Sequence, residues 1–128
     1  MVSRISHTSF DARDAYRQSV FWGEVLGFAE DPDDPNEPAH QECMILAPEG
    51  ATRLLFIEVP DDKTVKNRVH LDLRPTDRTR DAEVERLLAA GATQVADRRT
   101  PDGGWVVLAD PEGNEFCILR SDAEVAAG

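Results

Sequence analysis

The sequence predicts an α+β fold made of two copies of one unit, in which a strand is followed by a helix and then by two or three further strands. Three features of the first half recur in the second half at a constant offset of 63 residues. The first is a histidine in a strand-like stretch, at His7 and His70. The second is an acidic residue that can cap a helix, at Asp14 and Asp77. The third is a Pro-Glu-Gly turn, at residues 48–50 and 111–113. A constant offset across such different features indicates an internal repeat.

The first copy begins with polar and apolar residues that alternate over residues 4–11, a pattern typical of a half-buried strand. A helix is predicted over residues 14–26, because its apolar residues fall on one stripe and Gly27 supplies a stop. Apolar runs at residues 43–46 and 54–59 then predict two strands that are joined through the first Pro-Glu-Gly turn.

The second copy repeats this order. Residues 68–74 alternate like a strand, and a helix is predicted over residues 79–90 with Gly91 as its stop. Two further strands are predicted at residues 105–108 and 115–119, joined through the second Pro-Glu-Gly turn.

Three segments are expected to lie outside these elements. Residues 31–38 are acidic and contain three prolines, which indicates a loop. Residues 60–67 are expected to link the two copies, and the tail at residues 122–128 is expected to be frayed.

The composition limits the possible partners. The chain has 128 residues, which is the size of one domain, and 25 acidic against 14 basic residues give a formal charge of −11. No cluster of Lys and Arg is present to bind phosphates, and the net charge would be repelled from anionic lipid. With no secretory signal, no long apolar run and no predicted disulfide between Cys43 and Cys117, we expect a cytoplasmic protein with a small-molecule or protein partner, and neither nucleic acid nor membrane.

Three stretches carry a resemblance to a known family, at residues 21–28, 66–73 and 110–117. The last of these, Asp-Pro-Glu-Gly-Asn-Glu-Phe-Cys, is the most specific. Together with the repeat, they resemble the vicinal oxygen chelate superfamily, which includes glyoxalase I, bleomycin-resistance proteins and extradiol dioxygenases. The likeness covers roughly residues 4 to 120 and is greatest to the glyoxalase-like branch.

The resemblance implies a single glyoxalase-like domain over residues 1–128, with one module at about 4–60 and the other at about 67–120. Each module would be a β-α-β-β-β unit, and the two would form one curved, mostly antiparallel sheet with helices outside. Members of the superfamily often pair modules across subunits, so a homodimer is expected.

The resemblance also implies a metal site, because ligands in the superfamily come from the first and last strands of each module. The first-strand positions match His7 and His70, and the last-strand positions match Glu58 and Cys117. Two imidazoles and a carboxylate, from His7, His70 and Glu58, suit one divalent ion of Zn, Ni, Fe or Mn, whereas a thiolate ligand would favour Zn.

Other roles stay open for the same residues. The histidines can be hydrogen-bonded pocket residues without a metal, and Cys117 can be a small core residue. Glu58 lies eight residues after the glycine of its turn, against four for Cys117, so it can be an exposed residue near a strand end. Asp72 shares a strand face with His70 and can form an acid/base pair with it, or an ion pair with Arg74.

The predicted site therefore has three sets of residues. His70, Asp72 and Glu58 are the candidate catalytic residues; His7, Glu58 and His70 are the candidate metal ligands; Phe56, Trp105 and Cys117 are the candidate pocket residues. Trp105 follows two glycines and is expected to stack on the apolar body of a ligand.

Two classes of function fit these residues. One is a small-molecule enzyme, a lyase, isomerase or dioxygenase-like protein, that works through an enolate-like intermediate. The other is a non-catalytic protein that binds a drug or antibiotic, as the resemblance to bleomycin-resistance proteins implies. Authentic glyoxalase I activity is not expected, because Cys117 stands where that enzyme has a carboxylate.

Overall fold

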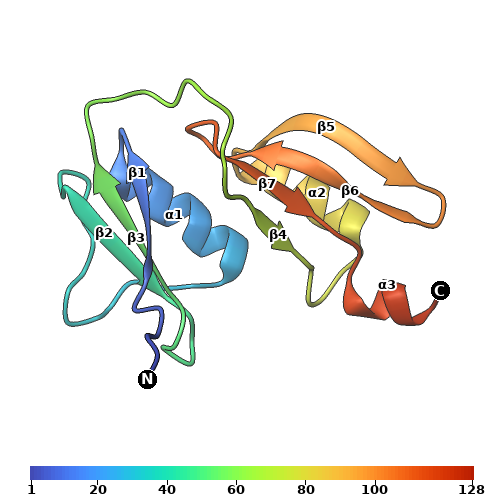
Figure 1. The fold of residues 1–128 in the computed structure, drawn as a ribbon, viewed down its shortest axis with the longest axis horizontal. Helices are drawn as coiled ribbons and strands as arrows, with labels where there is room; N and C mark the ends of the chain where they lie inside the picture. Colours follow the sequence, from blue (N-terminus) through green and yellow to red (C-terminus); the bar gives the residue numbers. More distant parts are fainter. The chain divides into compact units, whose positions relative to one another are not determined.

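The computed structural model describes residues 1–128 and confirms the α+β fold class (Figure 1). Seven strands lie in two mixed sheets, of three and four strands, where one curved sheet was expected. Three of the five strand pairings are antiparallel. The chain divides into two compact units, Met1–Asp62 and Lys63–Gly128.

The first unit contains β1 (Thr8–Ala12), α1 (Ala15–Leu26), β2 (Glu42–Leu46) and β3 (Arg53–Glu58). The strand order is β1-β3-β2; β1 is parallel to β3, and β2 is antiparallel to it. A parallel pair needs a crossover connection, which α1 provides. The helix has the predicted ends, because Asp14 accepts a hydrogen bond from the backbone of Arg17 and Gly27 adopts the left-handed conformation.

Aromatic packing fills the core of this unit. Phe56 of β3 is fully buried, and its ring centroid lies 5.4 Å from that of Phe10 in β1. The Phe10 ring lies 6.1 Å from Trp22 of α1, which is also buried. The face of β3 that carries Phe56 therefore packs beneath α1.

The acidic segment after α1 contains no named strand, in agreement with the loop that its prolines predict. A single bridge between Ala29 and Leu46 connects it to the free edge of β2. Further along, the Asn36 side chain donates to the carbonyl of Met44 at 2.8 Å and accepts from its N–H at 3.3 Å. The amide of Asn36 thus hydrogen-bonds backbone groups at the edge of β2 that would otherwise be unpaired.

The second unit contains β4 (Leu71–Leu73), α2 (Arg80–Ala90), β5 (Thr93–Thr100), β6 (Gly103–Ala109) and β7 (Glu115–Ile118). Its strand order is β4-β7-β6-β5, with β4 parallel to β7 and the other pairs antiparallel. The core lies between the sheet and α2, where six apolar side chains are fully or almost fully buried: Val84, Leu87, Val106, Leu108, Phe116 and Ile118.

Two expectations about helices are wrong. Asp77 does not cap α2; the cap is Thr79, whose hydroxyl accepts from the backbone N–H of Ala82 at 3.2 Å. Asp77 lies three residues before the first helical residue, too far to reach the free N–H groups of the first turn, and pairs with Arg78 instead.

The tail expected to be frayed forms α3 (Asp122–Ala126). Ser121 and Glu124 make a reciprocal capping box, and the Glu124 carboxylate also accepts from the backbone N–H of Arg80 at 2.6 Å. One glutamate therefore satisfies donors at the starts of two helices and ties α3 to α2. None of the three helices combines the length and the apolarity that a membrane crossing requires.

The hairpin between β5 and β6 depends on glycine. Gly104 has φ of +78°, and a Cβ there would lie 2.1 Å from the carbonyl oxygen of Arg98. Gly50, in the turn between β2 and β3, has nearly the same φ of +79° but open space around it.

We expect Gly50→Ala to lower the free energy of unfolding by about 1 kcal/mol, which is the cost of the backbone conformation alone. Gly104→Ala should cost at least about 1 kcal/mol more, because the collision with the Arg98 carbonyl is added to that cost. Urea denaturation of the two variants beside the wild type measures the difference. Equal losses would show that the hairpin relaxes freely around the new methyl group.

Candidate functional site

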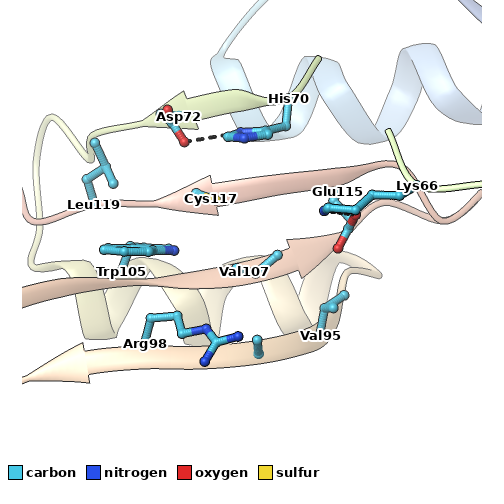
Figure 2. A pocket seen from close by; sticks show the side chains of 11 residues that line it. Lys66, His70, Asp72, Val95, Arg98, Trp105, Val107, Glu115, Cys117 and Leu119 are labelled. Atoms are coloured by element: carbon cyan, nitrogen blue, oxygen red, sulfur yellow. Dashed lines mark hydrogen bonds and ion pairs between the residues drawn. The ribbon is translucent and has the colours of Figure 1, made fainter. Parts of the chain in front are cut away.

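A pocket of about 490 Å³ lies on the face of the second unit's sheet that is opposite α2 (Figure 2). All of its lining residues belong to this unit. The charged and polar ones are Lys66, His70, Asp72, Arg98 and Glu115, and the others are Val95, Ala96, Trp105, Val107, Cys117 and Leu119. Mostly apolar walls with a few converging polar groups are typical of small-molecule sites.

Strand alternation explains why these side chains share a face. In β7, Phe116 and Ile118 are buried toward α2, so Glu115, Cys117 and Leu119 point to the pocket. The parallel pairing of β4 with β7 then sets Asp72 beside Cys117. His70 lies one residue before β4, as His7 lies one residue before β1, so both histidines precede the strands in which they were expected.

The Asp-Pro-Glu-Gly-Asn-Glu stretch fixes the start of β7. The Asp110 carboxylate accepts from the backbone N–H groups of Glu112 and Asn114, at 2.9 and 3.0 Å. The Asn67 side chain accepts from the backbone N–H of Glu115 at 2.9 Å. This motif is therefore a structural clamp that places Cys117 at its position in the strand.

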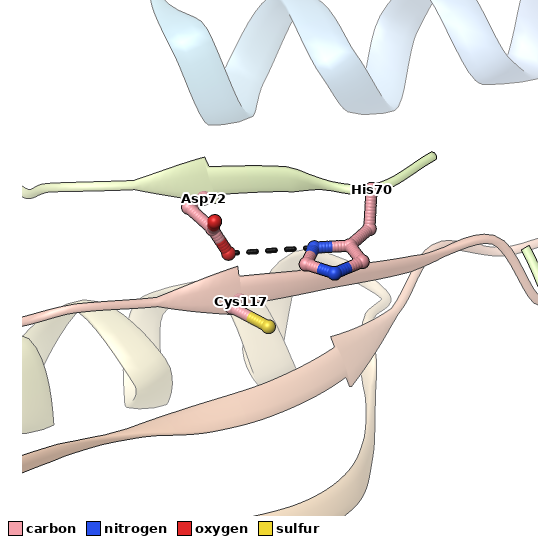
Figure 3. A group of neighbouring side chains, drawn as sticks. All are labelled: His70, Asp72 and Cys117. Atoms are coloured by element: carbon pink, nitrogen blue, oxygen red, sulfur yellow. Dashed lines mark ion pairs between the residues drawn. The ribbon is translucent and has the colours of Figure 1, made fainter. Parts of the chain in front are cut away.

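His70, Asp72 and Cys117 form a cluster at one side of the pocket (Figure 3). The Nδ1 atom of His70 lies 3.4 Å from Oδ1 of Asp72, and the thiol of Cys117 projects toward these two side chains. One ligand atom from each residue can be chosen so that all three lie within 4.8 Å of one another. Asp72 thus contacts the Nδ1 atom of His70, and Nε2 is the ring nitrogen that this contact does not involve.

Cys117 is only 7% exposed. Burial, the hydrogen bond with Asp72 and the negative charge of that carboxylate together raise the pKa of its thiol from an ordinary value of 9.0 to about 11. The thiol is therefore neutral near pH 7 in the absence of a cation. Two of the other charged residues pair with each other, since Lys66 Nζ lies 2.8 Å from Glu115 Oε1 and lowers the pKa of that carboxyl.

Three predicted site residues lie in the first unit. His7 is exposed, with its Nδ1 atom 3.0 Å from the hydroxyl of Ser6. Phe56 belongs to the core beneath α1 and is not among the residues that line the pocket. Glu58 is exposed at the end of β3, opposite Ala12.

The strand registers place Glu58 three positions after the counterpart of Cys117. The pairing of Asp72 with Cys117 in the second unit corresponds to the pairing of Ser9 with Leu55 in the first. Leu55 is therefore the counterpart of Cys117, and the repeat gives no support to Glu58 as a ligand. Its role in the site stays a prediction.

The glyoxalase-like domain family model matches residues 7–119 of the chain. The chain belongs to the glyoxalase-like domain family. This match confirms the predicted likeness to the glyoxalase-like branch. The search of curated proteins found no significant match.

Three solved structures illustrate the likeness of this glyoxalase-like chain. A glyoxalase/bleomycin resistance protein/dioxygenase family enzyme from Burkholderia phytofirmans has a TM-score of 0.70 and 24% identity, over 91% of this chain and 98% of that one. The fosfomycin resistance protein FosX from Mesorhizobium loti has a TM-score of 0.68 and 19% identity over 100% of both chains. FosX from Listeria monocytogenes, complexed with Mn(II) and a sulfate ion, has a TM-score of 0.67 and 17% identity, also over 100% of both.

The resemblance to the vicinal oxygen chelate superfamily implies a metal, and the donor chemistry of the cluster fits one. The imidazole of His70 and the thiol of Cys117 are ligand types that Zn²⁺ accepts, and the two are grouped on one face with the Asp72 carboxylate beside them. The contact between His70 Nδ1 and Asp72 is the outer-sphere arrangement that orients a ligating histidine, so Nε2 is the nitrogen that would bind. Because the Cys117 thiol is protonated at neutral pH, binding through sulfur would release a proton.

Several pocket residues of the glyoxalase-like chain were not identified from the sequence. Lys66 and Glu115 lie within the family stretches, but no pocket role was inferred for them. Arg98 was missed because β5 was not located: its sequence is largely polar and its alternation is broken by a bulge between Gln94 and Ala96. The signal available was the run of residues between Gly91 and the two glycines before Trp105, which is long enough for one strand.

We expect the Cys117 thiol of metal-free protein to react slowly with iodoacetamide. A pKa near 11 leaves a thiolate fraction near pH 8 about a hundredfold smaller than that of an ordinary cysteine with a pKa of 9.0. The alkylation rate should keep rising toward about pH 11, as mass spectrometry of a Cys43→Ser variant will measure. A rate that levels off near pH 9 would contradict the raised pKa.

Proposed function

We propose that the chain is a small-molecule enzyme of the glyoxalase-like branch that moves a proton on an organic substrate held in the pocket of the second unit. The observation that supports this proposal is the grouping of His70, Asp72 and Cys117 on one wall of that pocket. Such grouping of an acid/base pair with a further ligand-type side chain in a mostly apolar cavity suits catalysis better than packing.

In this proposal Asp72 is the proton-transfer group. Its side chain is half exposed to the pocket, so it can reach a substrate carbon next to a carbonyl, and its contact with His70 fixes its orientation. The proton passes from that carbon to the carboxylate and returns to the adjacent carbon, which leaves the atoms of the substrate balanced. The walls formed by Trp105, Val107 and Leu119 exclude water around the substrate.

His70 and Cys117 would hold a divalent metal, with Zn as the best match to a nitrogen and sulfur donor set. When bound, such a metal would stabilise the negative charge that develops on the substrate oxygen during proton transfer. The Mn(II) in the Listeria FosX structure supports metal dependence in this fold. His7 and Glu58 stay predicted as further ligands from the first unit, and the homodimer and the cytoplasmic location also stay predictions.

Zinc titration of metal-free protein tests the metal site. We expect wild-type protein to bind about one zinc ion per chain. His70→Gln should remove this binding, and Asp72→Asn should weaken it by about tenfold or more, because His70 loses its orienting partner. His40→Gln is the matched control, since His40 is exposed and lies in the first unit outside the pocket. Equal zinc affinity in the wild type and His70→Gln would contradict the proposed site.

We do not expect glyoxalase I activity. Glyoxalase I carries its base at the position that Cys117 occupies here, and this thiol is neutral near pH 7. The proposed base, Asp72, stands on the neighbouring strand and not at the position which that reaction uses. Turnover of the methylglyoxal–glutathione adduct should be absent or weak with added Ni(II) or Zn(II), measured beside a Cys117→Glu variant. Wild-type kcat/KM of about 10⁴ M⁻¹s⁻¹ or more would show that the thiol supports the reaction.

The alternative is a non-catalytic protein that binds a drug or antibiotic. Trp105 favours it, because this large aromatic side chain is 44% exposed on the pocket wall, where it can stack on a flat ligand. The two functions differ in what happens to a compound that binds. If the protein is a binder, the wild type releases the compound unchanged and Asp72→Asn keeps the affinity for it. If the protein is an enzyme, the wild type converts the compound and Asp72→Asn loses this turnover.

A further inference from the structure

The charged side chains of the pocket form pairs, with one exception. Lys66 pairs with Glu115, and His70 with Asp72. The side chain of the fifth residue, Arg98, makes no hydrogen bond or ion pair in the structure. Its guanidinium therefore contributes an unpaired positive charge to the lining of the pocket, although the chain as a whole carries a formal charge of −11.

The orientation of Arg98 is set by the sheet. A bulge at Val95 shifts the register of β5, after which Ala96 pairs with Val107 and Arg98 with Trp105. Residues directly opposite in an antiparallel pair have side chains on the same face, so the bulge brings Arg98 to the pocket side. Figure 2 shows Arg98 on β5 next to Trp105 on β6, both on the pocket wall.

The neighbours of Arg98 in β5 are used differently. Asp97 and Arg99 bond to each other at 2.8 Å, and Arg99 also reaches Asp81 in the first turn of α2 at 3.2 Å. This pairing lowers the pKa of Asp97 to about 2. The side chains of Asp97 and Arg99 thus bond to each other and connect the sheet to α2, whereas the side chain of Arg98 has no such partner.

We propose that Arg98 is a specificity-determining residue that binds an anionic group of the substrate, a carboxylate or a phosphonate, while Trp105 supports a flat or apolar body beside it. The planar guanidinium matches the two oxygens of such a group with parallel hydrogen bonds. The adjacent indole and the side chains of Val95 and Val107 provide apolar surface for the rest of the molecule. This inference rests on the proposed function, since it names the substrate class of the same pocket.

Binding of simple probes to metal-free protein tests the assignment. The probes are phenylphosphonate and benzoate, their neutral analogue benzamide, and inorganic phosphate. Each is titrated by calorimetry and by the change in tryptophan fluorescence, to which Trp105 contributes from the pocket wall and Trp22 from the core of the first unit. Without metal, an anion cannot gain affinity by chelation, so the measurement isolates Arg98. Wild-type protein should bind the two aromatic anions about tenfold or more tightly than benzamide, because a charge-assisted bidentate contact is added.

Arg98→Gln should reduce the affinity for both aromatic anions by about tenfold or more and leave benzamide unchanged. Arg98→Lys should recover part of the loss, because it restores the charge without the planar fork. Arg68→Gln is the matched control: Arg68 is an exposed arginine of the same unit that does not line the pocket, and it should bind all probes as the wild type does. Circular dichroism of each variant verifies folding.

Four results would overturn the proposal. Arg98→Gln could bind the aromatic anions as tightly as the wild type does, or the wild type could bind benzamide as tightly as it binds the anions. Arg68→Gln could lose as much affinity for the anions as Arg98→Gln does, or the wild type could bind neither aromatic anion. Inorganic phosphate bound as tightly as phenylphosphonate would overturn the apolar part of the assignment. These results are independent of zinc affinity and of turnover, so failure here leaves the proposed function standing. Loss of zinc binding or turnover would leave the anion site standing in turn.

Discussion

The parallel pairing of the first and last strands in each unit is the constraint on which the site depends. It requires a crossover connection, which α1 and α2 supply, and it sets one residue of the first strand beside one residue of the last. In the second unit that neighbouring pair is Asp72 and Cys117. In the first it is Ser9 and Leu55, which cannot hold a metal or transfer a proton as the other pair can. The repeated backbone therefore places a carboxylate beside a thiol at this position in the second unit alone.

Helix ends and turns could be predicted from the sequence because their signals are local. Asp14, Gly27 and Gly91 mark ends of α1 and α2 within one turn of the chain, and the two Pro-Glu-Gly turns connect the expected strands. The cap of α2 was misassigned because an aspartate at the repeat offset was preferred to Thr79, which is nearer the helix. The helix α3 was missed although Ser121 and Glu124 have the spacing of a capping box.

The site was harder to predict because it depends on register between distant strands. His70, Asp72, Trp105 and Cys117 do line one pocket, as alternation along their strands suggests. The register gives Leu55, and not Glu58, as the counterpart of Cys117: Leu55 lies five residues after Gly50 and Cys117 four after Gly113, whereas Glu58 lies eight after Gly50. The carboxylate made Glu58 a candidate, and no pattern in the sequence reports the register. To predict that Arg98 faces the pocket, the bulge at Val95 has to be known, because the bulge sets the register of the residues after it. No local pattern in a polar strand indicates such a bulge.

Asp72 links the protonation of the other two groups in the cluster. The same carboxylate contacts His70 and raises the pKa of the Cys117 thiol, so a change of charge at any one of the three affects the others. Burial and a neighbouring negative charge both favour the neutral thiol, and a divalent cation would oppose both effects by favouring the thiolate. The cluster is thus neutral at sulfur without a metal and exchanges a proton for a cation when one binds. Because the Cys117 thiol is neutral, it places no second negative charge beside the Asp72 carboxylate, as a carboxylate at position 117 would do.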